Sequence, residues 1–353
     1  MKPHVLVVRL DNNGDVLLAG PAIRAVAAGA RRVTLLCGPR GLDAARLLPG
    51  IDDLIVFRAP WIDPEPASVD ALTIRVLIDD LARREFDQAI VLTSFHQSAL
   101  PLALILRLAG IGTTAAISED YPGSLLDVRH RVSDDIHEVE RNLSLVATLG
   151  HSLPAGDDGR LRIKRQGTPA LRSPNGQGRH AAEVPYVVVH PGASAPARTW
   201  PASQHAALVR ALVRRGRKVV ISGGPDEARL TAEVAGGDRR VTDLGGRIGF
   251  SQLAALIAEA DVIVVGNTGP AHLAAAVGTP VVSLFAPVVP AVRWRPWRVP
   301  HVLLGDQLAS CAGSRARYCP IPGHPCLADV SVDDVLAAID QLSVASAEPV
   351  MAS

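Results

Sequence analysis

Short apolar runs alternate with longer stretches of helical periodicity along most of the chain, and this alternation predicts the fold class. In the first half, the apolar and β-branched runs predict strands at 5–9, 33–37, 54–57, 89–92 and 115–117. The stretches between and after them predict helices at 16–28, 42–48, 69–84, 99–109 and 136–149. Strands that alternate with helices build βαβ units, so we expect a parallel sheet covered on both faces.

The same alternation restarts in the second half of the chain. Strands are predicted at 186–190, 218–222, 241–244, 262–265 and 281–284, and helices at 201–215, 226–235, 251–259 and 270–277. Residues 303–327 have no regular period. A last helix is expected at 331–342, where Ser331 and Asp334 are spaced like a capping pair.

A polar stretch without apolar period separates the two halves. Residues 166–184 are rich in Gly, Pro and Arg, which predicts a flexible linker. We therefore expect an α/β protein with two domains, residues 1–165 and 185–345. Whether the helix at 331–342 packs back on the first domain is left open.

Composition narrows the class of protein but does not name a function. The 353 residues are 48% hydrophobic and 20% charged, as in globular proteins, and the formal net charge of +1 offers no electrostatic case for binding nucleic acid. The apolar runs are too short for a signal peptide or a membrane span. We expect a cytoplasmic protein and leave peripheral contact with the inner face of the membrane open. Four cysteines are too few for a disulfide framework.

Several common signatures are missing from the sequence. It contains no dinucleotide G-x-G-x-x-G, no P-loop, no G-x-S-x-G elbow and no Asp-x-Asp pair that would carry a divalent metal to a diphosphate. What remains is a set of four loops that follow predicted strands. Open α/β sheets bind ligands at the carboxyl ends of their strands, so these loops are the candidate site.

The first loop contains a carboxylate, and the second contains an arginine. Asp15 stands where the turn at 11–15 meets the first helix, and it is read either as a helix N-cap or as a carboxylate general base. In the second loop, the turn 191–194 includes Gly192 and Ser194, whose N–H groups suit a phosphate. Arg198 follows and is read either as a surface cation or as a bidentate phosphate ligand.

The other two loops are rich in glycine. Glycines precede Glu227 and permit close approach of a ligand, and that carboxylate suits a ribose diol or simply a helix start. The fourth loop, 266–269, leads into a helix whose first N–H groups suit an anion. Thr268 adds a hydroxyl there, and His272 is either a ligand or a packed core histidine.

Taken together, the loops resemble glycosyltransferase family 9, the heptosyltransferases. The motifs that carry the resemblance occur in the family's order along nearly the whole chain. They are Gly14-Asp15-Val16-Leu17, His190-Pro191-Gly192-Ala193-Ser194, Arg198-x-Trp200-Pro201, Gly223-Gly224-x-x-Glu227, Asp243-x-Gly245-Gly246 and Asn267-Thr268-Gly269-Pro270-Ala271-His272.

The resemblance implies the GT-B architecture, in which two Rossmann-like domains face a central cleft. It also implies an inverting, metal-independent transfer of a sugar, heptose from an ADP-linked donor, to a cell-envelope saccharide or another glycan. No cofactor is expected. By position, Asp15 is the base and Arg198 the cation at the donor phosphates. The implied donor-binding positions are Gly192, Ser194, Arg198, Glu227, Phe250, Asn267, Thr268, Gly269 and His272.

Two residues depart from the family pattern. Asn267 stands where better-known members carry Asp near the donor sugar, and Arg198 stands where they usually carry Lys. Asn keeps an acceptor oxygen but loses the charge, so the donor sugar is where this chain is expected to differ.

The cysteine-bearing tail adds an open question. Cys311, Cys319, Cys326 and His324 are read either as a Cys₃His zinc site or as a loop packed by small thiols, and the missing C-x-x-C hook favours the loop.

The sequence leaves two other functions open. A GT-B sugar-nucleotide epimerase would convert a sugar nucleotide without any acceptor. A non-catalytic nucleotide-sugar-binding protein would bind the donor without turnover.

Overall fold

The computed structural model describes residues 1–94, 96–164 and 186–347. The chain divides into two compact units, Met1–Lys164 and Arg165–Ser353. The linker expected at 166–184 lies outside the described residues.

The first unit is built on a six-stranded parallel sheet. Its strand order is β3-β2-β1-β4-β5-β6, so the first strand lies in the middle and the chain reverses direction across the sheet between β1 and β4. The strands are β1 His4–Arg9, β2 Arg32–Cys37, β3 Asp53–Val56, β4 Gln88–Val91, β5 Thr113–Ile117 and β6 Val128–His130.

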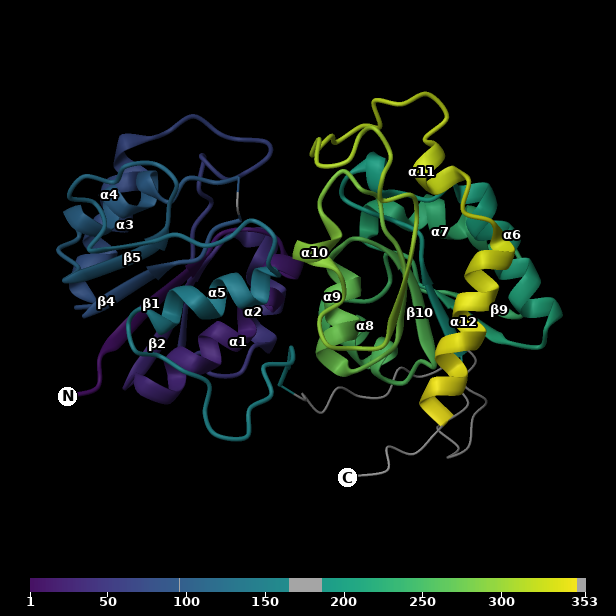
Figure 1. The fold of residues 1–353 in the computed structure, drawn as a ribbon, viewed down its shortest axis with the longest axis horizontal. Coiled ribbons are helices and arrows are strands. Elements are labelled where there is room, and N and C mark those ends of the chain that lie inside the picture. The colour runs from purple at the N-terminus through teal and green to yellow at the C-terminus, as the bar shows by residue number, and fades with distance from the viewer. Residues whose placement is uncertain (95, 165–185, 348–353) are drawn as a thin grey trace. The chain divides into compact units, whose positions relative to one another are not determined.

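Helices cover both faces of this sheet (Figure 1). The helices α1, α2 and α5 pack together on one face, and α3 and α4 pack together on the other. Their bounds are α1 Asn13–Gly29, α2 Leu42–Leu47 after the 3-10 turn η1 Pro39–Gly41, α3 Ala71–Arg83, α4 Leu100–Leu108 and α5 Glu138–Ala147.

The second unit repeats the same topology. Its strand order is β12-β11-β10-β7-β8-β9, which places β7 in the middle and the reversal between β7 and β10. The strands are β7 Tyr186–His190, β8 Lys218–Ile221, β9 Val241–Asp243, β10 Val262–Gly266, β11 Val281–Leu284 and β12 His301–Leu304.

The helices of the second unit also form two layers. The helices α6, α7 and α12 lie on one face of the sheet, and α8 and α9 lie on the other (Figure 1). Their bounds are α6 Ala202–Arg214 after η2 Pro196–Arg198, α7 Ala228–Ala235 after η3 Pro225–Glu227, α8 Phe250–Ala258, α9 Gly269–Val277, α10 Ala291–Trp294, α11 Pro325–Ala328 and α12 Val332–Ala347.

The central strands are apolar because both faces of each sheet are covered. Val187, Val189, Val262 and Val264 are fully buried in the core of the second unit. Helix α12 packs against α6 and strands β10 to β12 of its own unit, and Ser331 caps its first turn through bonds with Asp334 as expected.

The structure corrects two details of the expected elements. Each sheet has a sixth strand, β6 or β12, that the sequence pattern missed, because these short edge strands are only half-buried and lack a continuous apolar run. Helix α1 begins at Asn13 with Asn12 as N-cap, so the N-cap interpretation of Asp15 is wrong. Across the described ranges, no helix combines the length and apolar character needed to cross a bilayer.

Candidate functional site

The predicted base lies at the reversal point of the first sheet. Asp15 is in the first turn of α1, directly after the loop that follows the central strand β1. Its Oδ1 lies 3.2 Å from Nη2 of Arg9, the last residue of β1, and its side chain is 20% exposed. Asp15 therefore presents an accessible carboxylate that is held by a buried cation.

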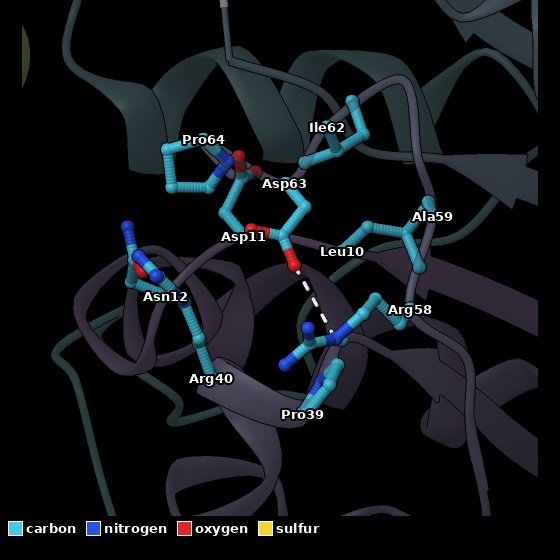
Figure 2. Close-up of a pocket in the computed structure, with 11 residues that line it drawn as sticks. Leu10, Asp11, Asn12, Pro39, Arg40, Arg58, Ala59, Ile62, Asp63 and Pro64 are labelled. Atoms are coloured by element: carbon cyan, nitrogen blue, oxygen red, sulfur yellow. Dashed lines mark ion pairs between the residues drawn. The ribbon is translucent and has the colours of Figure 1, made fainter. Parts of the chain in front are cut away.

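A pocket opens beside this loop (Figure 2). Two arginines, Arg40 and Arg58, line it together with two acids, Asp11 and Asp63. Arg58 is mostly exposed, and its Nε lies 3.4 Å from Oδ2 of the buried Asp63. The full lining is Leu10, Asp11, Asn12, Gly38, Pro39, Arg40, Arg58, Ala59, Ile62, Asp63 and Pro64. The mixture of cations and carboxylates suits a ligand that carries both hydroxyl and anionic groups.

In the second unit, Glu227 lies directly against the backbone of Gly192. A Cβ added to Gly192 would stand 1.9 Å from Oε1 of Glu227, so any side chain at this position would displace the Glu227 carboxylate. Oε2 of Glu227 accepts a hydrogen bond of 2.7 Å from the N–H of Gly224. The second and third predicted loops are thus in contact, so both could bind parts of the same donor molecule.

The histidine that ends β7 supports this contact. His190 is buried, its Nδ1 pairs with Oγ of Ser222 at 3.0 Å, and its Nε2 lies 3.7 Å from Oε2 of Glu227. Burial lowers the pKa of His190, while the Glu227 carboxylate acts in the opposite direction. The low pKa favours the neutral imidazole, which leaves the charge of Glu227 uncancelled.

The loop that carries Arg198 meets the end of β10. A Cβ on Gly266 would stand 2.8 Å from the carbonyl oxygen of Arg198, so this crossing requires glycine. Arg198 ends η2 and its side chain is half-buried. The second and fourth loops are therefore adjacent at the reversal point between β7 and β10.

The side chain of Asn267 bonds to the protein itself. It is 6% exposed, its Nδ2 donates to the carbonyl oxygen of Ala286 and its Oδ1 accepts from the N–H of Ala286, both at 3.3 Å. This pair of bonds joins the ends of the neighbouring strands β10 and β11. The sequence motif alone predicted a contact with the donor sugar at this position.

The remaining predicted donor residues follow the carboxyl ends of the strands of the second sheet. Thr268 is the N-cap of α9 and Gly269 its first residue, so the helix start faces the ends of the strands as expected. His272 is buried in the next part of that helix. Phe250 begins α8 and is half-buried, and Ser194 is exposed in the loop after β7.

The cysteine-bearing tail packs against the loop of Arg198. His324 Nε2 pairs with the carbonyl oxygen of Ala197 at 3.1 Å, and the carbonyl oxygen of Arg317 accepts from the N–H of Ala197 at 3.0 Å. Cys311 and Cys326 are buried free thiols, and burial raises the pKa of Cys326 to about 11. Among the described residues, no group of three His, Cys, Asp or Glu side chains is placed to hold a metal ion.

The sequence reasoning missed two groups that the structure places in the site. Arg9 and Asp11 were read as the end of a strand and part of a turn, yet they contact each other and Arg9 contacts Asp15. The available signal was a charged residue that ends an otherwise apolar central strand, two residues before an acid.

Comparisons with known proteins agree with these observations. The sequence profile described as glycosyltransferase family 9 (heptosyltransferase) matches residues 74–322. Two relatives from Escherichia coli are named lipopolysaccharide heptosyltransferase 3. One is 40% identical over 116 residues, 32% of this chain and 34% of the relative, and the strain K12 protein is 34% identical over 172 residues, 46% and 47% respectively. The aligned regions thus span less than half the length of these two relatives.

A solved structure shares the fold. The structure titled E. coli ADP-heptose lps heptosyltransferase II is 20% identical, covers 98% of this chain and 100% of its own, and has a TM-score of 0.75. The two Rossmann-like units are those of the GT-B fold. Because the family profile matches most of the chain, the protein belongs to glycosyltransferase family 9, the heptosyltransferase family.

Proposed function

We propose that this protein transfers heptose from an ADP-linked donor to a lipopolysaccharide-type saccharide, with inversion and without a metal. The observation that carries the proposal is the contact between Glu227 and Gly192 at the reversal point of the second sheet. A carboxylate against bare backbone suits a ribose diol, and the start of α9 suits the diphosphate beside it. The relatives are named as heptosyltransferases, one of them with ADP-heptose, and these names support the choice of sugar and nucleotide.

In the proposed reaction the acceptor hydroxyl attacks the anomeric carbon of the donor sugar. The new carbon–oxygen bond forms as the bond from that carbon to the diphosphate oxygen breaks, and ADP leaves with the electron pair. Asp15 takes the proton of the hydroxyl, and Arg198 with the first turn of α9 meets the charge that develops on the diphosphate.

The acceptor is proposed to bind the pocket beside Asp11. Arg40 and Arg58 would pair with phosphate or carboxylate groups of an anionic saccharide, and Asp63 would accept from a hydroxyl. A lipid-linked acceptor would place the protein at the cytoplasmic face of the membrane as a peripheral enzyme. The epimerase and the non-catalytic binder are not favoured by the family match.

The decisive test of the base is the substitution Asp15→Asn. We expect transfer to fall by about 10²–10⁴-fold, since that is the usual contribution of a general base, while ADP binding stays within about twofold of wild type. Asp43→Asn is the matched control, because Asp43 is an exposed acid of α2 whose side chain is 59% accessible. Near-normal transfer by Asp15→Asn would rule out the base.

The donor is tested separately by ligand-induced stabilisation. ADP-heptose, UDP-sugars and GDP-sugars are compared at equal concentration, and a ligand that binds only the folded protein raises its melting temperature. We expect ADP-heptose to give the largest shift. A larger shift with a uridine or guanosine donor would overturn the proposed nucleotide.

A further inference from the structure

Arg9 holds three carboxylates that come from three different elements. Its guanidinium is fully buried, and Nε lies 2.8 Å from Oδ2 of Asp11 in the loop after β1. Nη2 lies 3.2 Å from Oδ1 of Asp15 in α1, and Nη1 lies 3.7 Å from Oε2 of Glu138 in α5. One cation at the end of the central strand therefore ties the predicted base to two buried acids.

The remaining groups around the cluster come from α5 and from the loop after β4. Nη2 of Arg9 also donates to Oγ of Ser94 at 2.8 Å, and the Gln97 amide donates to Asp11. The other titratable groups here are His96 in the loop, the buried His137 that caps α5, and Glu140 and the buried Arg141 of α5.

Arg9 is one cation, and it forms ion pairs with three carboxylates. Burial raises the pKa of Asp11 to about 6, while the charge of Arg9 opposes this rise and the charge of Asp15 adds to it. Since buried charges interact strongly, the removal of Arg9 or of Asp15 changes the protonation of Asp11.

We propose that Arg9 is a positioning residue for the transfer reaction: from within the buried cluster it holds Oδ1 of Asp15, so that Oδ2 is directed to the acceptor hydroxyl. The inference rests on the proposed role of Asp15 as base. The guanidinium suits this task because its planar fork reaches acids in three directions, whereas the single ammonium of lysine cannot span them.

The test is the pH profile of kcat/KM for Arg9→Lys, measured with ADP-heptose and heptose-free lipopolysaccharide. We expect kcat to fall about 10- to 100-fold with little change in the KM for the donor, because the base is misplaced. The acid limb should move to higher pH, because the lysine ammonium cannot reach all three acids, and Asp11, whose proton uptake the charge of Arg9 opposes, then takes up a proton more readily.

A second variant is expected to move the profile in the opposite direction. Glu138→Gln keeps the side-chain shape but removes one negative charge from the cluster, so the acid limb should move to lower pH. This variant decides the question if Arg9→Lys does not fold.

A matched control separates positioning from stability. Arg24 is another buried arginine, on the same helix as Asp15, and its Nε lies 2.7 Å from Oδ2 of Asp157. Arg24→Lys should lower stability without moving the acid limb. Unmoved acid limbs in both Arg9→Lys and Glu138→Gln, with Asp15→Asn inactive, would overturn the Arg9 inference alone. Wild-type transfer by Asp15→Asn would instead overturn the proposed base and the inference together.

Discussion

The two sheets of this protein have the same strand order but carry different chemistry at their reversal points. The central strand of the first sheet ends in Arg9, which pairs with the buried carboxylates of Asp11 and Glu138 and with the more accessible Asp15. The central strand of the second ends in His190, and the loop after it brings Gly192 against Glu227. The strand order places a loop and a helix start at the reversal point of each sheet. The side chains then decide whether that point carries a cluster of charges or backbone that a ligand can approach closely.

The difference fits the two tasks we propose. A proton acceptor needs a carboxylate whose charge is held by neighbouring groups, and the first unit supplies them from three elements. A diphosphate and a ribose need backbone N–H groups and room for close approach, which glycine supplies in the second unit. Four predictions test this contrast, in order of decreasing effect.

Gly192→Ala should abolish donor binding by the second unit and leave the cluster around Asp15 in the first unit intact. The added Cβ would overlap Glu227 and force it away, so we expect the Kd for ADP to rise at least ~100-fold and stability to fall by about 1–3 kcal/mol. Calorimetric titration with ADP measures the affinity. Gly224→Ala is the control, since its Cβ would meet Glu227 at an ordinary 3.7 Å and should cost much less.

Asn267→Asp should weaken the bond between the ends of β10 and β11. A carboxylate cannot donate to the carbonyl oxygen of Ala286, so we expect a loss of about 1–3 kcal/mol in unfolding free energy. The affinities for ADP and for ADP-heptose should fall by the same factor. A change confined to ADP-heptose would restore the interpretation of Asn267 as a sugar contact.

His205→Phe should flatten the acid sensitivity of the second unit. Burial lowers the pKa of His205 to about 3, so the unfolded state binds more protons below pH 6.5 and wild type loses stability as pH falls from there. Each pH unit in this window costs about 1.4 kcal/mol for one such group. Urea unfolding at pH 7.0, 6.0 and 5.0, followed by the fluorescence of the neighbouring Trp200, should show a shallower decline in the variant. Equal slopes would contradict the assignment.

His324→Ala should have the smallest effect. It removes the bond to the carbonyl oxygen of Ala197 next to Arg198, and we expect a loss of about 0.5–1.5 kcal/mol and a three- to tenfold weaker binding of ADP. Thermal unfolding and ADP titration measure both. Leu308→Ala, in an exposed part of the same tail, is the control. Unchanged ADP affinity would show that the tail does not support the donor loop.

Most of the fold could be predicted from the sequence, because apolar periodicity is a local property. The buried strands β1 and β7 have the predicted bounds to within one residue, since both are apolar on both faces. The edge strand β12 was missed because its residues are only half-buried and its pairing with β11 depends on a distant part of the chain.

The candidate site was predicted only in part. The motifs predicted Gly192, Glu227 and Gly269 as neighbours of a donor, and the structure brings the first two into contact. The partners of Asn267 were not predictable, because Ala286 reaches it only through the pairing of two neighbouring strands.

The sequence by itself determined the class of fold, the family and the positions of the four loops, since these follow from local periodicity and short motifs. Only the tertiary structure decided that Arg9 joins Asp11, Asp15 and Glu138 in one buried cluster. The physical reason is that charge partners are set by strand order and helix packing. These bring together groups that are far apart in the chain, and burial then strengthens their interaction.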